Sequence, residues 1–225
     1  MYASKKAIHL LTLLTFVFSG LASAGDKEPP KEIDGMLMKE DSEVDLAYVR
    51  PDVDWKKFDS IYIRELKVTD EAKDATPQNE RKGRGHMRES WLIPEEDITL
   101  MKTEFARILK ETLEEDGHKV TTDVTAKTLV LVPTIVDIYL TAPIEESRDT
   151  FSSRGGTFTD GAGSMTLTAI FADGTDLHVL AYAIDNKYPS TMWARNTRVR
   201  NMSDMRRIFK YWGNNLSEAL EKVTK

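Results

Sequence analysis

The chain has 225 residues, with 31 Lys and Arg against 37 Asp and Glu, so its formal net charge at pH 7 is −6. Such a chain lacks the excess of Lys and Arg that neutralises phosphates, which argues against general nucleic-acid binding. It contains no cysteine, which excludes disulfides, thiol catalysis and zinc or iron–sulfur centres ligated by cysteine. The length suits one domain.

The first 24 residues have the features of a cleavable secretory signal. Two lysines come first, the apolar stretch 8–21 follows, and Ala22 and Ala24 are the small residues that a signal peptidase recognises. Cleavage would leave Gly25 as the new N-terminus. The apolar stretch is shorter than the roughly 20 residues of a membrane span, although an uncleaved anchor is the alternative. We therefore expect a periplasmic domain, and loss of the two lysines takes the net charge from −6 to −8.

The mature chain is expected to begin with a flexible leader and two strands. Residues 25–43 are polar and charged, which is typical of a flexible leader, and the single domain should occupy residues 44–225. Residues 44–49 are expected to form a short edge strand, and the alternating residues 60–68 a second strand. The polar stretch 69–91 is long for a connection inside a domain, so we expect a mobile excursion there.

Positive charge gathers in this excursion, within an otherwise acidic protein. Arg81, Lys82, Arg84 and Arg88 lie close together, and Trp91 follows them. Such a patch could contact an anionic lipid head group, a glycan or an acidic partner. The alternative is a solubilising loop whose Trp91 packs at the entry of the next helix.

A helix and a long strand are expected next. Residues 94–116 combine a proline and three acidic residues at the start with apolar residues at helical spacing, and Gly117 provides a stop. Residues 128–140 are rich in Val, Ile and Leu around Pro133, which predicts a strand that is broken or bulged at the proline.

Residues 165–172 and 175–185 are expected to form a β-hairpin around Asp173 and Gly174. A two-residue turn would place Met165 opposite Tyr182 and make one face of the hairpin apolar. A further strand is expected near residues 192–194.

The C-terminal helix is expected to open after Ser203, a good N-cap, with an apolar stripe that docks on the sheet. Its aromatic residues Phe209 and Trp212 fall on that stripe, so a core role is favoured over a ligand groove. The order of elements predicts an α+β fold, an antiparallel or mixed sheet of about five strands with two main helices packed on one face.

Three segments resemble a family of bacterial envelope proteins known as domain of unknown function 3313, many of which are lipoproteins. They are residues 45–59, residues 161–173 and residues 206–216, the last with its Phe209 and Trp212. The resemblance covers most of the mature chain and implies no established activity.

No catalytic, cofactor-binding or metal-ligating residues are predicted. Ser164 follows glycines but does not fit the G-x-S-x-G turn of serine hydrolases. The histidines His86, His118 and His178 show no spacing typical of a metal site. An enzyme would need a cluster of titratable residues in a cleft.

The sequence thus predicts a non-enzymatic interaction or accessory module of the cell envelope, which contacts an unknown envelope protein or an anionic envelope component. The alternative is a small-molecule or lipid carrier with a pocket between the sheet and the helices. No cofactor is expected.

Overall fold

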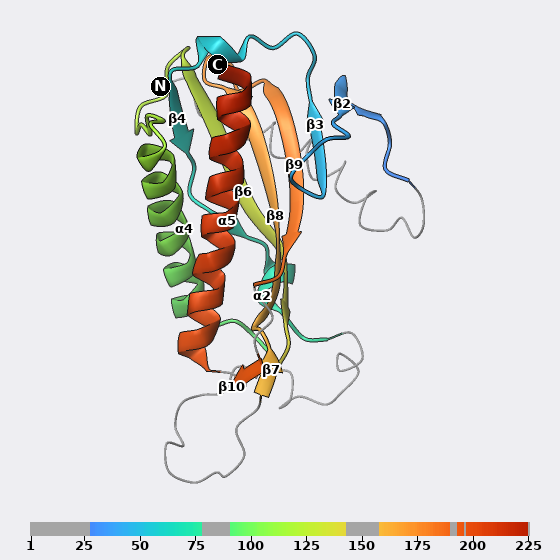
Figure 1. The fold of residues 1–225 in the computed structure, drawn as a ribbon, viewed down its shortest axis with the longest axis vertical. Coiled ribbons are helices and arrows are strands. Elements are labelled where there is room, and N and C mark those ends of the chain that lie inside the picture. The colour runs from blue at the N-terminus through green and yellow to red at the C-terminus, as the bar shows by residue number, and fades with distance from the viewer. Residues whose placement is uncertain (1–27, 78–90, 143–157, 190–192, 196, 225) are drawn as a thin grey trace.

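Two long amphipathic helices cover one face of a twisted sheet (Figure 1). The computed structural model describes residues 28–77, 91–142, 158–189, 193–195 and 197–224. In chain order the elements are β1 (Glu32–Ile33), β2 (Met36–Met38), β3 (Leu46–Val49), the 3-10 helix η1 (Trp55–Lys57), β4 (Ser60–Ile63), β5 (Lys67–Val68), α2 (Asp70–Lys73), α4 (Glu95–Glu115), β6 (Thr128–Leu140), β7 (Phe158–Asp160), β8 (Gly163–Asp173), β9 (Val179–Lys187), β10 (Trp193–Arg195) and α5 (Arg198–Thr224).

The main sheet is mixed and has eight strands. Its order is β1-β2-β3-β9-β8-β6-β4, and β5 also pairs with β6. Strands β4 and β5 run parallel to β6, and the other neighbours are antiparallel. The predicted α+β class and mixed sheet are confirmed, but about five strands is too few. Strands β1, β2 and β5 have only two or three residues each, too short for alternation to reveal them.

Part of the expected leader belongs to this sheet. Strands β1 and β2 form a tight hairpin through Asp34 and Gly35, both at positive φ, and β2 pairs with β3. Met36 is buried and packs in a cluster with Tyr48. Strand β3 is therefore an interior strand and not the edge strand expected at residues 44–49.

Pro133 lies inside an unbroken 13-residue strand. Arg64 N donates to Leu131 O and Thr69 N donates to Ile135 O, so the odd-numbered residues of β6 turn their backbone groups toward β4 and β5. Pro133 faces the gap between these two short strands, where its missing N–H leaves no ladder partner unsatisfied. The expected irregularity occurs instead between Ile135 and Asp137.

Helices α4 and α5 run side by side in the same direction. Ion pairs join Asp97 to Arg198 and Glu104 to Arg206. Gly213 lets α5 come close to α4, because a Cβ there would already lie 3.1 Å from Thr112 side-chain atoms. Within the part of the chain that the structure describes, no helix combines the length and the hydropathy of a membrane span.

The predicted bounds of the first helix are confirmed, while those of the second are not. Pro94 is the N-cap of α4 and Asp116 its C-cap. Helix α5 begins at Arg198, six residues before the expected start, and Thr197 Oγ1 accepts from the backbone N–H of Arg200. Thr197 thus supplies the cap that Ser203 was expected to provide.

The β8–β9 hairpin has a longer loop than expected. Residues 174–178 connect the strands, and the Asp173 carboxylate accepts from Thr175 N at 2.8 Å. Met165 therefore pairs with Lys187 and not with Tyr182. This register decides which side chains face the helices.

Two apolar clusters lie on opposite faces of the sheet. On the helix face, residues such as Leu131, Ile135 and Leu167 pack against α4 and α5. On the other face, Val130 and Tyr182 belong to the cluster that includes the N-terminal hairpin.

Candidate functional site

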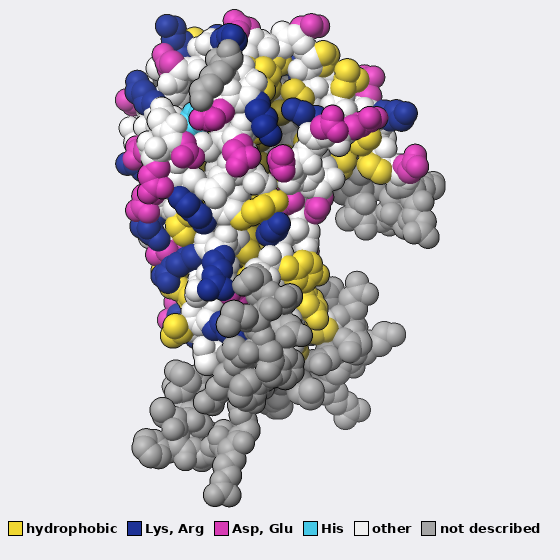
Figure 2. Space-filling view, viewed as in Figure 1, with side chains coloured by type: hydrophobic (Ala, Val, Ile, Leu, Met, Phe, Trp, Pro, Cys, Tyr) yellow, Lys and Arg dark blue, Asp and Glu magenta, His cyan; other side chains and the backbone are white. Residues whose placement is uncertain are grey.

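A cavity of about 480 Å³ lies between the C-terminal half of α5 and the helix face of β3, β9, β8 and β6. Small-molecule sites in proteins commonly measure roughly 300–1,000 Å³. Figure 2 shows hydrophobic side chains in a hollow beside the upper half of α5, with Lys, Arg, Asp and Glu side chains around it. Its volume lies within the range of small-molecule sites.

The floor of the cavity is a row of small residues that crosses four strands. Ala47 on β3 pairs with Ala183 on β9, Ala183 pairs with Ala169 on β8, and Ala169 pairs with Pro133 on β6. All four line the cavity. Side chains this short do not reach α5, so the space between the helix and the sheet stays open.

The walls of the cavity are also apolar. The next row across the sheet contributes Ala181 and Phe171, and α5 contributes Leu216 and Leu220. Phe105 closes the cavity from α4. A ligand in this space would meet mostly hydrocarbon.

Asp185 is a buried carboxylate in the cavity lining. Trp212 Nε1 donates to its Oδ2 at 2.8 Å, and Asp45 N donates to its Oδ1 at 3.2 Å. Burial raises the pKa of Asp185, while the hydrogen bond from Trp212 opposes that rise. Both oxygens have donors, so this carboxylate ties α5 to the sheet and to the segment before β3.

Residues 39–45 connect β2 to β3 and are here named the strap, and most of them line one side of the cavity. The backbone oxygen of Glu43 accepts from Tyr211 Oη at 3.2 Å and from Asn215 Nδ2 at 3.5 Å. Lys222 Nζ lies 3.6 Å from Glu43 Oε1. The strap is thus held against α5 by few and mostly exposed contacts.

Two tyrosines beside the cavity are deeply buried. Tyr48 donates its hydroxyl hydrogen to Pro30 O at 2.7 Å, and it pairs across the strands with Tyr182. Burial raises the pKa of both hydroxyls, and the raise at Tyr182 is large. Both hydroxyls therefore stay neutral at physiological pH.

The sequence-based site residues are mostly not part of this cavity. The signal residues Ala22, Ala24 and Gly25 lie outside the described residues, as do the four cations of the excursion, Arg81, Lys82, Arg84 and Arg88. Trp91 is only 5 % exposed, which agrees with its packing role. The proposed partner contact at these residues stays a prediction.

Other residues that the sequence singled out lie apart from one another. Ser164 is buried near the start of β8. His118 Nε2 lies 3.1 Å from Ser217 Oγ, and among the described residues no three His, Asp or Glu side chains are placed so that they could hold a metal ion. Phe209 is fully buried in the core, as expected, whereas Trp212 serves both the core and the cavity.

Sequence reasoning missed the row of alanines. Ala47, Ala169 and Ala183 are far apart in sequence, and a single alanine in a strand carries no functional signal. They form a row only through the observed register of β3, β9 and β8. A correct loop length for the hairpin would have paired Ala169 with Ala183 and so revealed part of the row.

Comparisons with known proteins give a family and weak structural likenesses. None of the curated proteins matches this sequence. A PelC dodecamer structure from Paraburkholderia phytofirmans is 12% identical, with a TM-score of 0.34 over 72% of this chain and 86% of that one. A neuraminyllactose-binding hemagglutinin homolog from Helicobacter pylori is 14% identical, with a TM-score of 0.39 over 73% and 87%.

A DUF4136 family protein from Bacteroides thetaiotaomicron is 12% identical, with a TM-score of 0.37 over 86% of this chain and 99% of that one. All three TM-scores lie below 0.5, so no argument about ligand or assembly rests on these likenesses. The model of the family described as "Protein of unknown function (DUF3313)" matches residues 36–216. The chain therefore belongs to the DUF3313 family.

Proposed function

We propose that this protein is a non-enzymatic binding protein of the cell envelope whose cavity holds an apolar small molecule, such as a single acyl chain. The observation that carries the proposal is the cavity of about 480 Å³ between α5 and the row of alanines. This function is the alternative that the sequence left open, a small-molecule or lipid carrier with a pocket between the sheet and the helices.

The lining favours an acyl chain over a polar ligand. Each methylene that leaves water for such a site contributes about 0.8 kcal/mol. The buried carboxylate of Asp185 already accepts hydrogen bonds from Trp212 and Asp45, so it does not need a polar ligand group to satisfy it. Affinity should come from chain length more than from the head group.

The length of the cavity suits an extended ligand. Along α5 its lining runs from Trp212 to Val223, which at 1.5 Å per residue corresponds to roughly 16 Å. The lining on β9 runs beside it, from Ala181 to Asp185. An acyl chain lying parallel to α5 would contact both walls.

The partner-binding module that the sequence favoured rests on Arg81, Lys82, Arg84 and Arg88, which the structure does not describe. The cavity is formed by described residues, and it therefore carries the proposal. Export to the periplasm through the signal at residues 1–24 is part of the proposal, and an N-terminal sequence of the purified protein that starts at Gly25 would support it.

Intrinsic fluorescence offers a direct test, because Trp55 and Trp212 both line the cavity. The purified protein is titrated with saturated fatty acids of increasing length and with the matching alcohols. We expect affinity to rise about fourfold per methylene, the equivalent of about 0.8 kcal/mol, until the cavity is full, and to be similar for acid and alcohol. An absence of binding at every length, or affinity independent of length, would contradict the proposal.

A further inference from the structure

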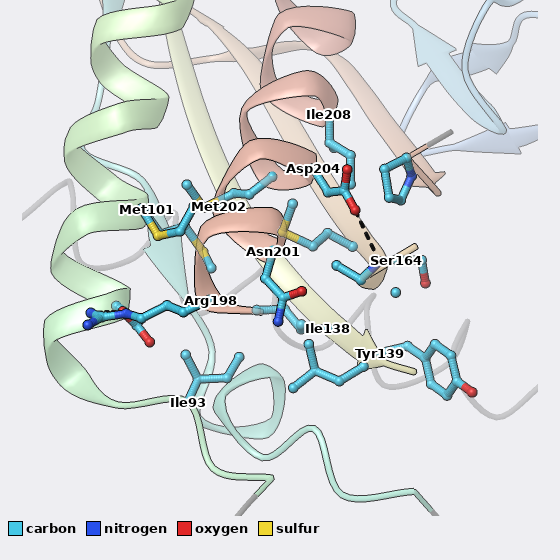
Figure 3. A pocket seen from close by; sticks show the side chains of 17 residues that line it. Ile93, Met101, Ile138, Tyr139, Ser164, Arg198, Asn201, Met202, Asp204 and Ile208 are labelled. Atoms are coloured by element: carbon cyan, nitrogen blue, oxygen red, sulfur yellow. Dashed lines mark hydrogen bonds and ion pairs between the residues drawn. The ribbon is translucent and has the colours of Figure 1, made fainter. Parts of the chain in front are cut away.

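A second cavity, of about 100 Å³, lies between the N-terminal parts of α4 and α5 and the sheet below them (Figure 3). Four methionines line it: Met101 from α4, Met165 from β8, and Met202 and Met205 from α5. Met101, Met165 and Met205 are buried, and Met202 packs against the same cluster. Three separate elements thus bring thioether side chains to one small space.

The spacing on α5 places two of these side chains together. Met202 and Met205 are three residues apart, so they are neighbours on one face of the helix. In Figure 3 Met202 and Met101 extend from α5 and α4 toward the same cavity. Methionine side chains from both helices would contact a ligand there, and Met165 would contact it from the sheet.

Methionine often fills irregular gaps in cores, but here the gap is not filled. A space of about 100 Å³ remains between the two helices and the sheet, far more than the roughly 10–15 Å³ that one water requires. The remaining lining is largely aliphatic, with Ile138 and Ile208 among its members. The methionines therefore line an open space in an apolar setting.

The oxygen atoms near this space are mostly engaged elsewhere. Asp204 accepts from Ala162 N at 3.2 Å and from Arg207 Nη1 at 3.2 Å, and Asp97 pairs with Arg198. Among the described residues, Asn201 Oδ1 is buried and has no hydrogen-bond partner, and Asn201 lines the cavity. The donors left for a ligand are thus thioether sulfurs and neutral oxygens, those of Asn201 and Ser164.

Thioether sulfur is a soft ligand that selects Cu(I) over the hard cations that carboxylates prefer. The apolar lining disfavours a doubly charged ion, because burying charge without compensation is costly. We propose that Met101, Met165, Met202 and Met205 form a binding site for Cu(I). This inference is independent of the ligand in the larger cavity.

The test uses the purified protein and two probes. Cu(I) is titrated without oxygen in competition with a chromogenic chelator, and Ag(I), a soft cation of the same charge with no redox chemistry in air, is titrated while the methyl signals of carbon-13-labelled methionine are recorded by NMR. We expect one ion per chain and shifts in the signals of the four site methionines, while that of Met36 stays in place.

The matched variants separate ligand loss from misfolding. Met202→Leu combined with Met205→Leu conserves volume, and Met36→Leu makes the same exchange at a buried position in the cluster on the other face of the sheet. We expect the double variant to lose at least about tenfold in Cu(I) affinity. The loss of a group that only orients a ligand already lowers metal affinity by about tenfold or more, and the loss of direct ligands should lower it at least as much. Met36→Leu should bind as the unmodified protein does. Unchanged affinity in the folded double variant, or no binding of either ion by the unmodified protein, would overturn the proposal.

Discussion

Helix α5 packs on the sheet in two different ways along its length. In its middle, Phe209 contacts Phe105 edge-to-face with ring centroids 5.1 Å apart, and it is fully buried. Closer to its C-terminus the same helix faces Ala183 and Ala169, and a cavity remains. One helix on one face of one sheet thus forms both a close-packed core and a candidate site.

The difference comes from the sheet and not from the helix. The apolar stripe of α5 continues through both regions, with Phe209 in the first and Leu216 and Leu220 in the second. What changes is the size of the facing side chains on the strands. A pattern read from α5 alone therefore cannot distinguish a core from a pocket.

The largest expected effect is in the close-packed region. Phe209→Ala should lower the free energy of unfolding by about 3–5 kcal/mol, because it removes a fully buried ring and leaves a void. Leu216→Ala, at the cavity wall, should cost no more than about 2 kcal/mol, the low end for such a change. Urea unfolding of both variants measures the difference. Equal losses would mean that the two regions are packed alike.

The next effect tests the same contrast by adding volume. Ala172→Leu, at a close-packed position on the other face, should destabilise the protein by about 1–3 kcal/mol through overpacking. Ala183→Leu should be neutral or stabilising, because the added atoms enter the cavity. Thermal unfolding compares the two variants with the unmodified protein, and a clear loss of stability in Ala183→Leu would show that the space is not available.

A smaller effect should appear in the pH dependence of stability. The pKa of Asp185 is raised by burial, so the folded state holds this proton more tightly than the unfolded state, whose pKa is about 3.9. The stabilisation is fully present below about pH 3.9 and is lost as the pH rises through the folded pKa.

The substitution Asp185→Asn replaces the titrating carboxyl group with an amide that does not titrate. The unmodified protein should therefore lose stability relative to the variant as the pH rises from about 4 to neutrality. Urea unfolding of both proteins across this range cancels the contributions of other carboxylates. A stability difference that does not change with pH, or that changes in the opposite direction, would contradict the assignment.

The smallest effect is expected at the strap. The ion pair between Lys222 and Glu43 is largely exposed, so Lys222→Ala should change the free energy of unfolding by less than about 1 kcal/mol. Added salt should reduce even that change. A salt-independent loss of several kcal/mol would show that the strap is held more firmly than its contacts indicate.

The sequence predicted the elements better than the arrangement that creates the site. The periodicity of α4, the alternation along β8 and the apolar stripe of α5 are local signals, and the α+β class followed from their order. The row of Ala47, Ala183 and Ala169 depends on pairing between distant strands and on the five-residue loop after Asp173. The predicted loop was three residues too short, and this error changes the cross-strand partner of every residue in the hairpin.

The central claim is that the open space beside the alanine row binds an apolar ligand. It is tested most directly by calorimetric titration of Ala183→Leu with the fatty acid that binds the unmodified protein best, with Ala106→Leu, the same exchange at an exposed position of α4, as the control. The account predicts that Ala183→Leu remains folded and loses most of the binding, while Ala106→Leu binds as before. Full binding by folded Ala183→Leu would contradict it.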